Sequence, residues 1–408
     1  MKLIGAVVEF CAVFLILVFF PFPSSVIGYS KSLYISEFIL LIFILYLFLK
    51  NNYKVYLCNT MYMLLTLVGI NLLTVFIAFF NGTVQFNMLS EVLRVIEWIV
   101  IYQFFSNWIN RNGFEILLIS IEKTLKVMYF LLIPFFIIEF FDLSFKELFR
   151  VVYCMSKSGS YFSSYSRISG PFRNPNFCAA CIAIFMLGIL MSKCNNLYKI
   201  FIALISSLII YYTGSRTGLV SAIVVLIVAY TCKIVYTKNK NLCIKIFIFV
   251  FISGIFLMNF PFEKLTRYNS RMADFGKVLG SFGGRLELWV EALGVFKENI
   301  LLGVNKRNNI VYDNLYIQLL VQHGLIGFIF YGSFYAINFW KTFKIVREKK
   351  SDISYFSFSV QTVIFVLGIT MQVFDVLQIA IWYFFTVACI DCYKCLDYKK
   401  YNCNFSKL

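Results

Sequence analysis

Two arginines that stand near glycines could bind an anion. Arg216 lies in the stretch Thr213 to Gly218, between two apolar runs that are too close together to leave a loop. Arg285 follows Gly283 and Gly284 in a longer hydrophilic stretch. A guanidinium carries a permanent charge and paired N–H donors, which suit phosphate oxygens. We therefore predict that Arg216 and Arg285 bind an anion, with an ordinary solvated charge as the alternative for Arg285.

The segment after Arg285 is expected to form an amphipathic helix. Leu286, Trp289, Leu293 and Phe296 recur at helical spacing, which predicts one apolar stripe along the helix. The glycines before this segment would let the chain turn and bring Arg285 over a site.

A second candidate anion site lies in Ser169 to Asn176. Asn174 suits a helix N-cap and Pro175 the first helical position, so a helix is expected to begin here. The unpaired amides and partial positive charge of a helix start attract anions, and nearby arginines would add to this. Plain capping is the alternative for the asparagines. The candidate substrate-binding residues of this segment are Arg167, Arg173, Asn174 and Asn176, and Ser215 joins them from the Arg216 segment.

Further polar residues open the apolar run after residue 312. Asp313 could be a helix cap or a general base, and the sequence does not separate these roles. Asn314 follows it as a candidate substrate-binding residue. His323 would lie about two and a half turns inside the helix. A packed, hydrogen-bonded histidine is the favoured interpretation there, and substrate binding is the other.

Ionisable residues also occur within an apolar run. Glu91, Arg94 and Glu97 are spaced three apart and therefore share one helix face. At this depth such groups are expected to point into the protein or a wet cavity. A structural ion triad is one interpretation, and Glu97 lining a substrate chamber is the other.

The elements that must position these residues are membrane helices. The chain has 61% apolar, 19% aromatic and 14% charged residues among 408, a composition that no water-soluble domain could cover with polar surface. Spanning a bilayer takes about 20 apolar residues of helix, and such runs recur here. We predict an all-α, polytopic integral membrane protein with about twelve transmembrane helices. Their expected ranges are 3–20, 33–49, 57–80, 88–105, 124–141, 177–192, 199–212, 218–235, 246–260, 314–340, 354–375 and 377–393.

The charge pattern predicts topology rather than nucleic-acid binding. The net charge is +17, but Lys and Arg mostly fall in short segments between apolar runs, which places both termini in the cytoplasm. The hydrophilic stretches 142–176 and 261–313 then become external loops of one membrane domain, 1–408. The twelve cysteines suggest no disulfide framework, and neither a metal site nor a cofactor is expected.

The motifs, in this order, resemble the O-antigen ligase and polymerase superfamily. The resemblance covers Gly170 to Asn176, Ser215 to Gly218, Gly284-Arg285 with Trp289 and Phe296 to Gly303, and Asp313-Asn314 to Gly327. It implies a metal-independent glycosyltransferase of the GT-C-like membrane architecture, acting outside the cytoplasm on undecaprenyl-pyrophosphate-linked oligosaccharide. In ligases of this superfamily a His commonly stands where this chain has Asp313, and this departure favours a polymerase.

The motifs and the resemblance together suggest a mechanism and partners. Our hypothesis for the mechanism is that Arg216 and Arg285 bind the pyrophosphate, helped by Arg173 and by the helix starts. Asp313, with Glu287 or Glu291 as the less favoured alternatives, would take the proton from the attacking sugar hydroxyl. The expected partners are the lipid-linked oligosaccharide, membrane lipid of the bacterial plasma membrane and a chain-length regulator protein, with no nucleic acid. A ligase acting on lipid A core or protein, and a flippase of lipid-linked sugars, are the alternatives.

Overall fold

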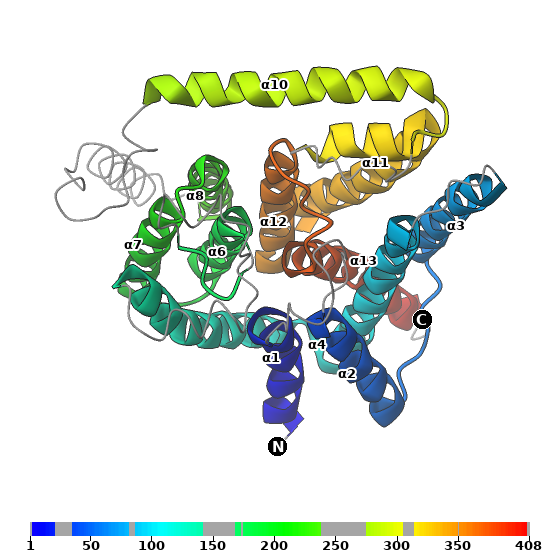
Figure 1. Ribbon diagram of the computed structural model, residues 1–408. Helices are drawn as coiled ribbons and strands as arrows, with labels where there is room; N and C mark the ends of the chain where they lie inside the picture. The colour runs from blue at the N-terminus through cyan, green and yellow to red at the C-terminus, as the bar shows by residue number, and fades with distance from the viewer. Residues whose placement is uncertain are drawn as a thin grey trace. The chain divides into compact units, whose positions relative to one another are not determined.

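The computed structural model describes residues 2–20, 35–80, 86–141, 168–172, 174–237, 275–304, 314–349 and 351–405, and every regular element in these ranges is an α-helix (Figure 1). The predicted all-α class is thus confirmed for them. The helices are α1 (Lys2–Phe19), α2 (Ile35–Asn51), α3 (Asn59–Phe80), α4 (Phe86–Phe140), α6 (Pro175–Met191), α7 (Asn196–Tyr212), α8 (Arg216–Thr237), α10 (Phe275–Glu298), α11 (Leu315–Lys349), α12 (Asp352–Gly368) and α13 (Leu377–Phe405).

Most helices coincide with the apolar runs of the sequence. Within the described ranges, α3 and α11 are long and apolar enough to cross a bilayer, and several others are apolar but shorter. The expected helix 246–260 lies outside the described residues. The number of about twelve spans therefore stays a prediction.

One predicted loop is wrong. The segment between the expected helices 88–105 and 124–141 continues as helix, so that α4 runs from Phe86 to Phe140. The chain breaks helical geometry only at Gly113, with φ 82° and ψ 170°. Glycine adopts positive φ without the steric cost that a Cβ brings, so two helical stretches join there without a loop.

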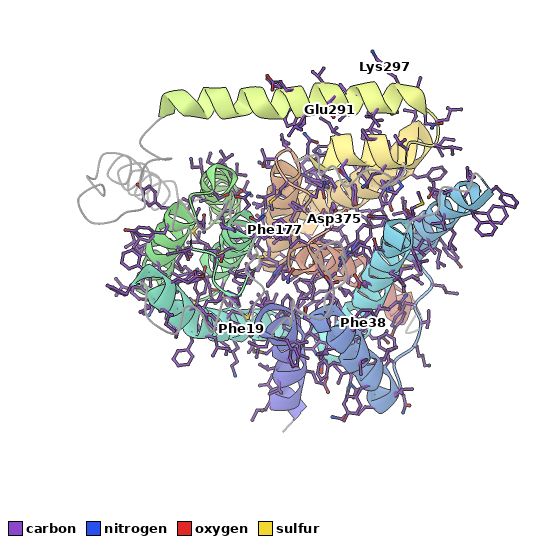
Figure 2. All side chains as sticks on the ribbon, in the orientation of Figure 1. Phe19, Phe38, Phe177, Glu291, Lys297 and Asp375 are labelled. Carbon is purple, nitrogen blue, oxygen red and sulfur yellow. The ribbon has the colours of Figure 1, made fainter. Side chains whose placement is uncertain are left out.

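A second correction concerns the end of the expected helix 354–375. The observed α12 stops at Gly368, and the chain then turns until α13 begins at Leu377. The amides of Ile369 and Thr370 bond to carbonyls three residues back, which tightens the last turn and closes the helix. Asp375 lies in this connection rather than in a helix (Figure 2).

The described residues divide into two compact units. Unit 1 takes in α1 to α3, α4 as far as Ser120, α10 from Gly284, and α11 to α13. Unit 2 takes in the rest of α4 with α6, α7 and α8. Within unit 1, α11 packs against α3 and α12, while α13 packs against α12 and α1; within unit 2, α6 packs against both α7 and α8. The prediction of a single membrane domain stays a prediction.

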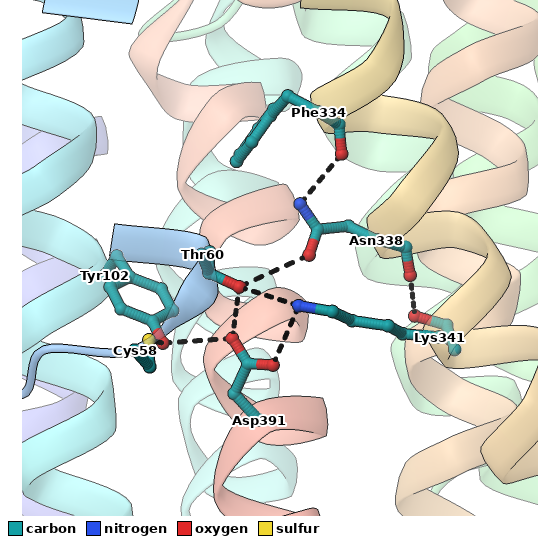
Figure 3. A network of polar contacts seen from close by, with 8 residues as sticks. Cys58, Thr60, Tyr102, Phe334, Asn338, Lys341 and Asp391 are labelled. Atoms are coloured by element: carbon teal, nitrogen blue, oxygen red, sulfur yellow. Dashed lines mark hydrogen bonds and ion pairs between the residues drawn. The ribbon is translucent and has the colours of Figure 1, made fainter. Parts of the chain in front are cut away.

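A polar network ties four helices of unit 1 together (Figure 3). Asp391 of α13 accepts hydrogen bonds from Thr60 of α3 at 2.5 Å and from Tyr102 of α4 at 3.0 Å. Lys341 of α11 contacts the other Asp391 oxygen at 3.4 Å and donates to Thr60 Oγ1 at 3.0 Å. Helices that contact each other only through apolar side chains can shift along one another, whereas these directional hydrogen bonds fix the register of the four helices.

The Asp391→Ala substitution should lower the free energy of unfolding by about 2 kcal/mol, because it removes the acceptor for three side chains in a mostly buried site. Thermal unfolding of purified protein measures this. The matched control is Glu348→Ala, which breaks the exposed Lys344–Glu348 pair of α11 and should cost less than about 0.5 kcal/mol. Equal effects of the two substitutions would contradict the role of the network.

Candidate functional site

The predicted helix start at Asn174 is present in unit 2. Asn174 has extended backbone geometry, with φ −133° and ψ 133°, and its side-chain oxygen accepts the amide of Asn176 at 2.8 Å. Pro175 occupies the first helical position. The capping role is confirmed, and contact of Asn174 or Asn176 with a substrate stays a prediction. The external loop expected over 142–176 ends at this cap, before α6; its residues 142–167 and 173 lie outside the described ranges.

The chain just before this start is held by Glu139, a residue that the sequence analysis missed. Its Oε2 accepts the amides of Ser169 at 2.9 Å and Gly170 at 2.8 Å, and the Glu139 side chain is buried at the end of α4. Gly170 has φ +55°, and a Cβ there would lie 2.8 Å from the ring of Phe136. A carboxylate at the end of an apolar run is the only signal that the sequence gives for Glu139.

The Arg216 segment lies beside the Ser169 segment in unit 2. The amide of Ile168 donates to the carbonyl of Tyr212 at 3.2 Å, which joins the two chains ahead of α6 and α8. Ser215 Oγ accepts the amide of Gly218 at 3.0 Å and so caps α8, whose first residue is Arg216.

The first turns of α6 and α8 approach each other closely. A Cβ on Gly218 would collide with the Cβ of Ala179, and both residues lie within the first turns of their helices. The N-termini of α6 and α8 therefore face the same end of unit 2. Their partial positive charges add, which favours an anion at that end. The side chain of Arg216 is not among those described, and Arg167 and Arg173 lie outside the described residues.

In unit 1 the start of α11 corrects the predicted cap. The side-chain oxygen of Asn314 accepts the amides of Tyr316 at 2.9 Å and Ile317 at 3.1 Å, so Asn314 caps the helix. Asp313 lies outside the described residues. Its predicted role as a general base stays a prediction.

The amphipathic helix expected after Arg285 is present as part of α10, with two differences. Gly283 and Gly284 lie inside the helix, which runs from Phe275 to Glu298, so they form no turn before it. The predicted stripe is only partly packed, since Leu286 is 51% and Leu293 41% exposed. Ala292 is fully buried instead and packs against Val321 of α11.

The other candidates on α10 can be placed by their exposure. Glu287 and Glu291, the alternative proton acceptors, are both exposed, and Figure 2 labels Glu291 together with Lys297. Arg285 lies on the helix, but its side chain is not among those described. Its contact with an anion stays a prediction.

A second glycine break joins α10 to α11. Gly324 has φ +62°, so α11 consists of two helices that meet there rather than the continuous helix expected over 314–340. The amides of Leu325 and Ile326 begin the second helix, and they donate to the carbonyls of Ile300 and Leu301 at 2.8 and 3.1 Å. The chain that follows α10 is thus fastened into the break, which fixes the C-terminal end of α10 against α11.

His323 lies directly before this break and is buried. Its ring stacks on Tyr331 at 5.0 Å between centroids, and the Tyr331 hydroxyl accepts a hydrogen bond from Asn71 Nδ2 at 2.7 Å. This geometry agrees with the packed interpretation of His323. Its contact with a substrate stays a prediction.

The Arg94–Glu97 contact of the ion triad expected on α4 is present, and a carboxylate from another helix joins it. Arg94 Nη1 contacts Glu97 Oε2 at 2.7 Å and Glu37 Oε1 at 2.8 Å, and Glu37 comes from α2 rather than α4. Sequence spacing placed Glu91 in the triad and gave no sign of Glu37. All three side chains of the observed triad are almost completely buried, and contact of Glu97 with a substrate stays a prediction.

The comparisons with known proteins identify part of the chain. Residues 201–332 match the family model described as O-antigen ligase, which confirms the resemblance over that region. A comparison with curated proteins gave no match. The matched region includes Arg216, Arg285, Asn314 and His323. The family match and the apolar helices together indicate that the chain is a membrane protein.

The Gly324→Ala substitution should lower the melting temperature and separate the chain after α10 from α11. Alanine is strained at this φ, and its Cβ would collide with the backbone of Gly303. Hydrogen exchange of Leu325 and Ile326 should become faster. The control is Gly332→Ala in the same helix, where a Cβ meets no atom within 4 Å and the helix should keep its stability. Unchanged exchange in Gly324→Ala would contradict the fastening.

Proposed function

We propose that this chain, whose residues 201–332 belong to the O-antigen ligase family, joins undecaprenyl-pyrophosphate-linked oligosaccharide repeats at the outer face of the bacterial plasma membrane. The product is a polysaccharide of the O-antigen or capsular kind. The observation that carries this proposal is the pairing of two helix N-termini in unit 2, one of which begins with Arg216.

The chemistry follows from the donor. The acceptor hydroxyl oxygen attacks the anomeric carbon of the donor sugar, and the bond from that carbon to the pyrophosphate oxygen breaks. The lipid pyrophosphate leaves with the bonding electrons, so its negative charge grows during the step. Cations and helix N-termini that meet this charge stabilise the transition state.

Different residues bind the leaving pyrophosphate and accept the proton. Arg216 and Arg285 bind the pyrophosphate oxygens, with help from Arg173, and Asp313 accepts the proton from the acceptor hydroxyl. The fastening of α10 to α11 supports the role of Arg285, because a helix fixed at one end holds its side chains in place.

The architecture we propose is a GT-C-like bundle of about twelve transmembrane helices with both termini in the cytoplasm. The segments 142–176 and 261–313 then face outward, with α10 in the second of them. A chain-length regulator protein is a partner of this arrangement.

A ligase is the second candidate, because the matched family model is described as O-antigen ligase. The two activities share the donor and differ in the acceptor. Asp313 in place of the His common in ligases is the feature that favours the polymerase.

Purified protein in lipid vesicles should lengthen lipid-linked repeats without added nucleotide or divalent metal. Electrophoresis of the extracted lipid should show a ladder of chains, each on one pyrophosphate lipid. Transfer of a whole glycan to lipid A core without a ladder would establish the ligase instead. Movement of lipid-linked sugar across the membrane without any transfer would identify a flippase. Activity that a chelator abolishes and metal restores would contradict the metal-independent mechanism.

Arg216→Ala and Arg285→Ala should each abolish polymer while single-repeat product and membrane insertion remain. Lysine at either position keeps the charge but loses the bidentate contact, so it should restore activity only partly. Asp313→Asn should lose turnover while donor binding is largely kept. The ladder assay and binding of radiolabelled donor measure these effects.

Lys297→Ala is the matched control, since Lys297 is an exposed cation near the end of α10 and should be dispensable. Normal polymer from both arginine variants at normal expression would show that the pyrophosphate clamp is wrong.

A further inference from the structure

Two exposed aliphatic side chains, Ile300 and Leu301, follow α10 in unit 1. They are 50% and 61% exposed, although they lie in the segment 261–313 that the proposed topology places outside the membrane. A single apolar residue on a surface needs no explanation, whereas a continuous apolar surface marks contact with another molecule. What adjoins these two residues decides between the two cases.

The exposed face of α11 adjoins them. The amides of Leu325 and Ile326 donate to the carbonyls of Ile300 and Leu301, so the two segments lie side by side. Leu325 and Ile326 are themselves 41% and 40% exposed. Further exposed apolar side chains recur along α11 at helical spacing, namely Ile329, Phe330, Ile337, Trp340 and Phe343. Ile300 and Leu301 therefore lie at one end of an apolar stripe that follows α11.

The length of α11 places this end of the stripe at an edge of the bilayer. α11 is long and apolar enough to cross a membrane, and its second part begins at Leu325. From Leu325 to the exposed Lys344 the helix rises about 28 Å, at about 1.5 Å per residue. The hydrocarbon core is about 30 Å thick, and an exposed lysine amine lies outside it. Leu325 therefore lies at the opposite edge of the hydrocarbon core, and Ile300 and Leu301 lie at the same depth.

The backbone of this segment suits an environment without water. Backbone polar groups that lose water must bond inside the protein. The carbonyls of Ile300 and Leu301 accept the two amides of α11 at 2.8 and 3.1 Å. The amide of Val304 donates to the carbonyl of Val321 at 2.9 Å. The segment thus turns bonded backbone groups toward α11 and leaves aliphatic side chains exposed.

We propose that Ile300 and Leu301 form a membrane anchor, a short segment whose side chains insert among lipid acyl chains beside α11. The partner is the lipid leaflet at the end of α11 that lies opposite its basic end. Lipid is favoured over a second protein because the anchor adjoins the exposed stripe of a helix that can cross the bilayer. The anchor requires only that the chain is a membrane protein, and it does not rest on the glycosyl-transfer function.

The anchor keeps the C-terminal end of α10 at the level of the lipid head groups. α10 ends at Glu298, just before Ile300, and Ala292 of α10 packs against Val321 of α11. The end of α10 is therefore held by α11 on one side and by lipid just beyond it. A lipid-linked pyrophosphate lies at this level, so the anchor also serves the proposed function.

Fluorescence quenching tests the anchor. A genetically encoded fluorescent residue replaces Leu301, or Ile300 in a second variant, in full-length protein held in nanodiscs of phosphatidylethanolamine and phosphatidylglycerol. Lipid with a doxyl group near the head-group end of its acyl chain should quench both positions. Iodide in the buffer, which reaches both faces of a nanodisc, should quench them several-fold less than it quenches the same residue at a position exposed to water.

The controls come from α11. Glu348 is exposed beyond the basic end of the stripe and serves as the position in water. Ile337 lies in the middle of the stripe and serves as the position in lipid. Hydrogen exchange of Leu325 and Ile326 at the wild-type rate shows that a labelled variant keeps its backbone bonds, and either labelled position is sufficient for the test.

Two outcomes would overturn the anchor. Iodide quenching at both labelled positions as strong as at Glu348, without quenching by doxyl lipid, would place the segment in water. Protection from iodide and from doxyl lipid together would show that protein covers the segment, for example a second copy of the chain. Neither measurement involves glycan transfer, so a failure of the proposed function would leave the result on the anchor unchanged.

Discussion

A polar group removed from water must find its partner inside the protein, and most of the described polar contacts follow from this constraint. Glu139 accepts two amides of the chain before α6, and Asn314 accepts two amides at the start of α11. After the break at Gly324, the amides of Leu325 and Ile326 have no partner within the helix, and they donate to the carbonyls of Ile300 and Leu301, which follow α10. In each case the group that accepts these backbone amides also fixes where a helix begins.

The same constraint separates the arginines that can meet a substrate from one that cannot. Arg94 is buried and already bonded to Glu37 and Glu97, so an incoming pyrophosphate would have to displace carboxylates that the protein holds in place. Arg216 begins a helix instead, where the amides of the first turn favour a negative charge. Whether an arginine can bind an anion therefore depends less on its charge than on the groups that it already contacts.

The sequence predicts contacts between residues that are close in the chain, and it does not predict contacts between residues that are far apart in the chain. The cap at Asn174 and the helix start after Ser215 depend on neighbouring residues, and both were predicted. Glu37 pairs with a residue 57 positions away and Glu139 with one 30 positions away, so no local pattern reveals them. The break at Gly324 was missed because a glycine inside an apolar run is usually tolerated within a helix. Around Gly113 the error was the opposite one, since the polar residues there predicted a loop where the helix continues on both sides of the glycine.

The cap at Asn314 bears on which group accepts the proton. A carboxylate that accepts helix amides is stabilised in its charged form and becomes a weaker base. Here the amides of Tyr316 and Ile317 bond to the neutral side chain of Asn314, so these two amides need no carboxylate as a cap. His323, two turns further on, is buried and stacked on Tyr331, where its ring has little room to follow a reacting hydroxyl. A base must reach the proton that it removes, so the buried and stacked His323 fits the role of general base poorly.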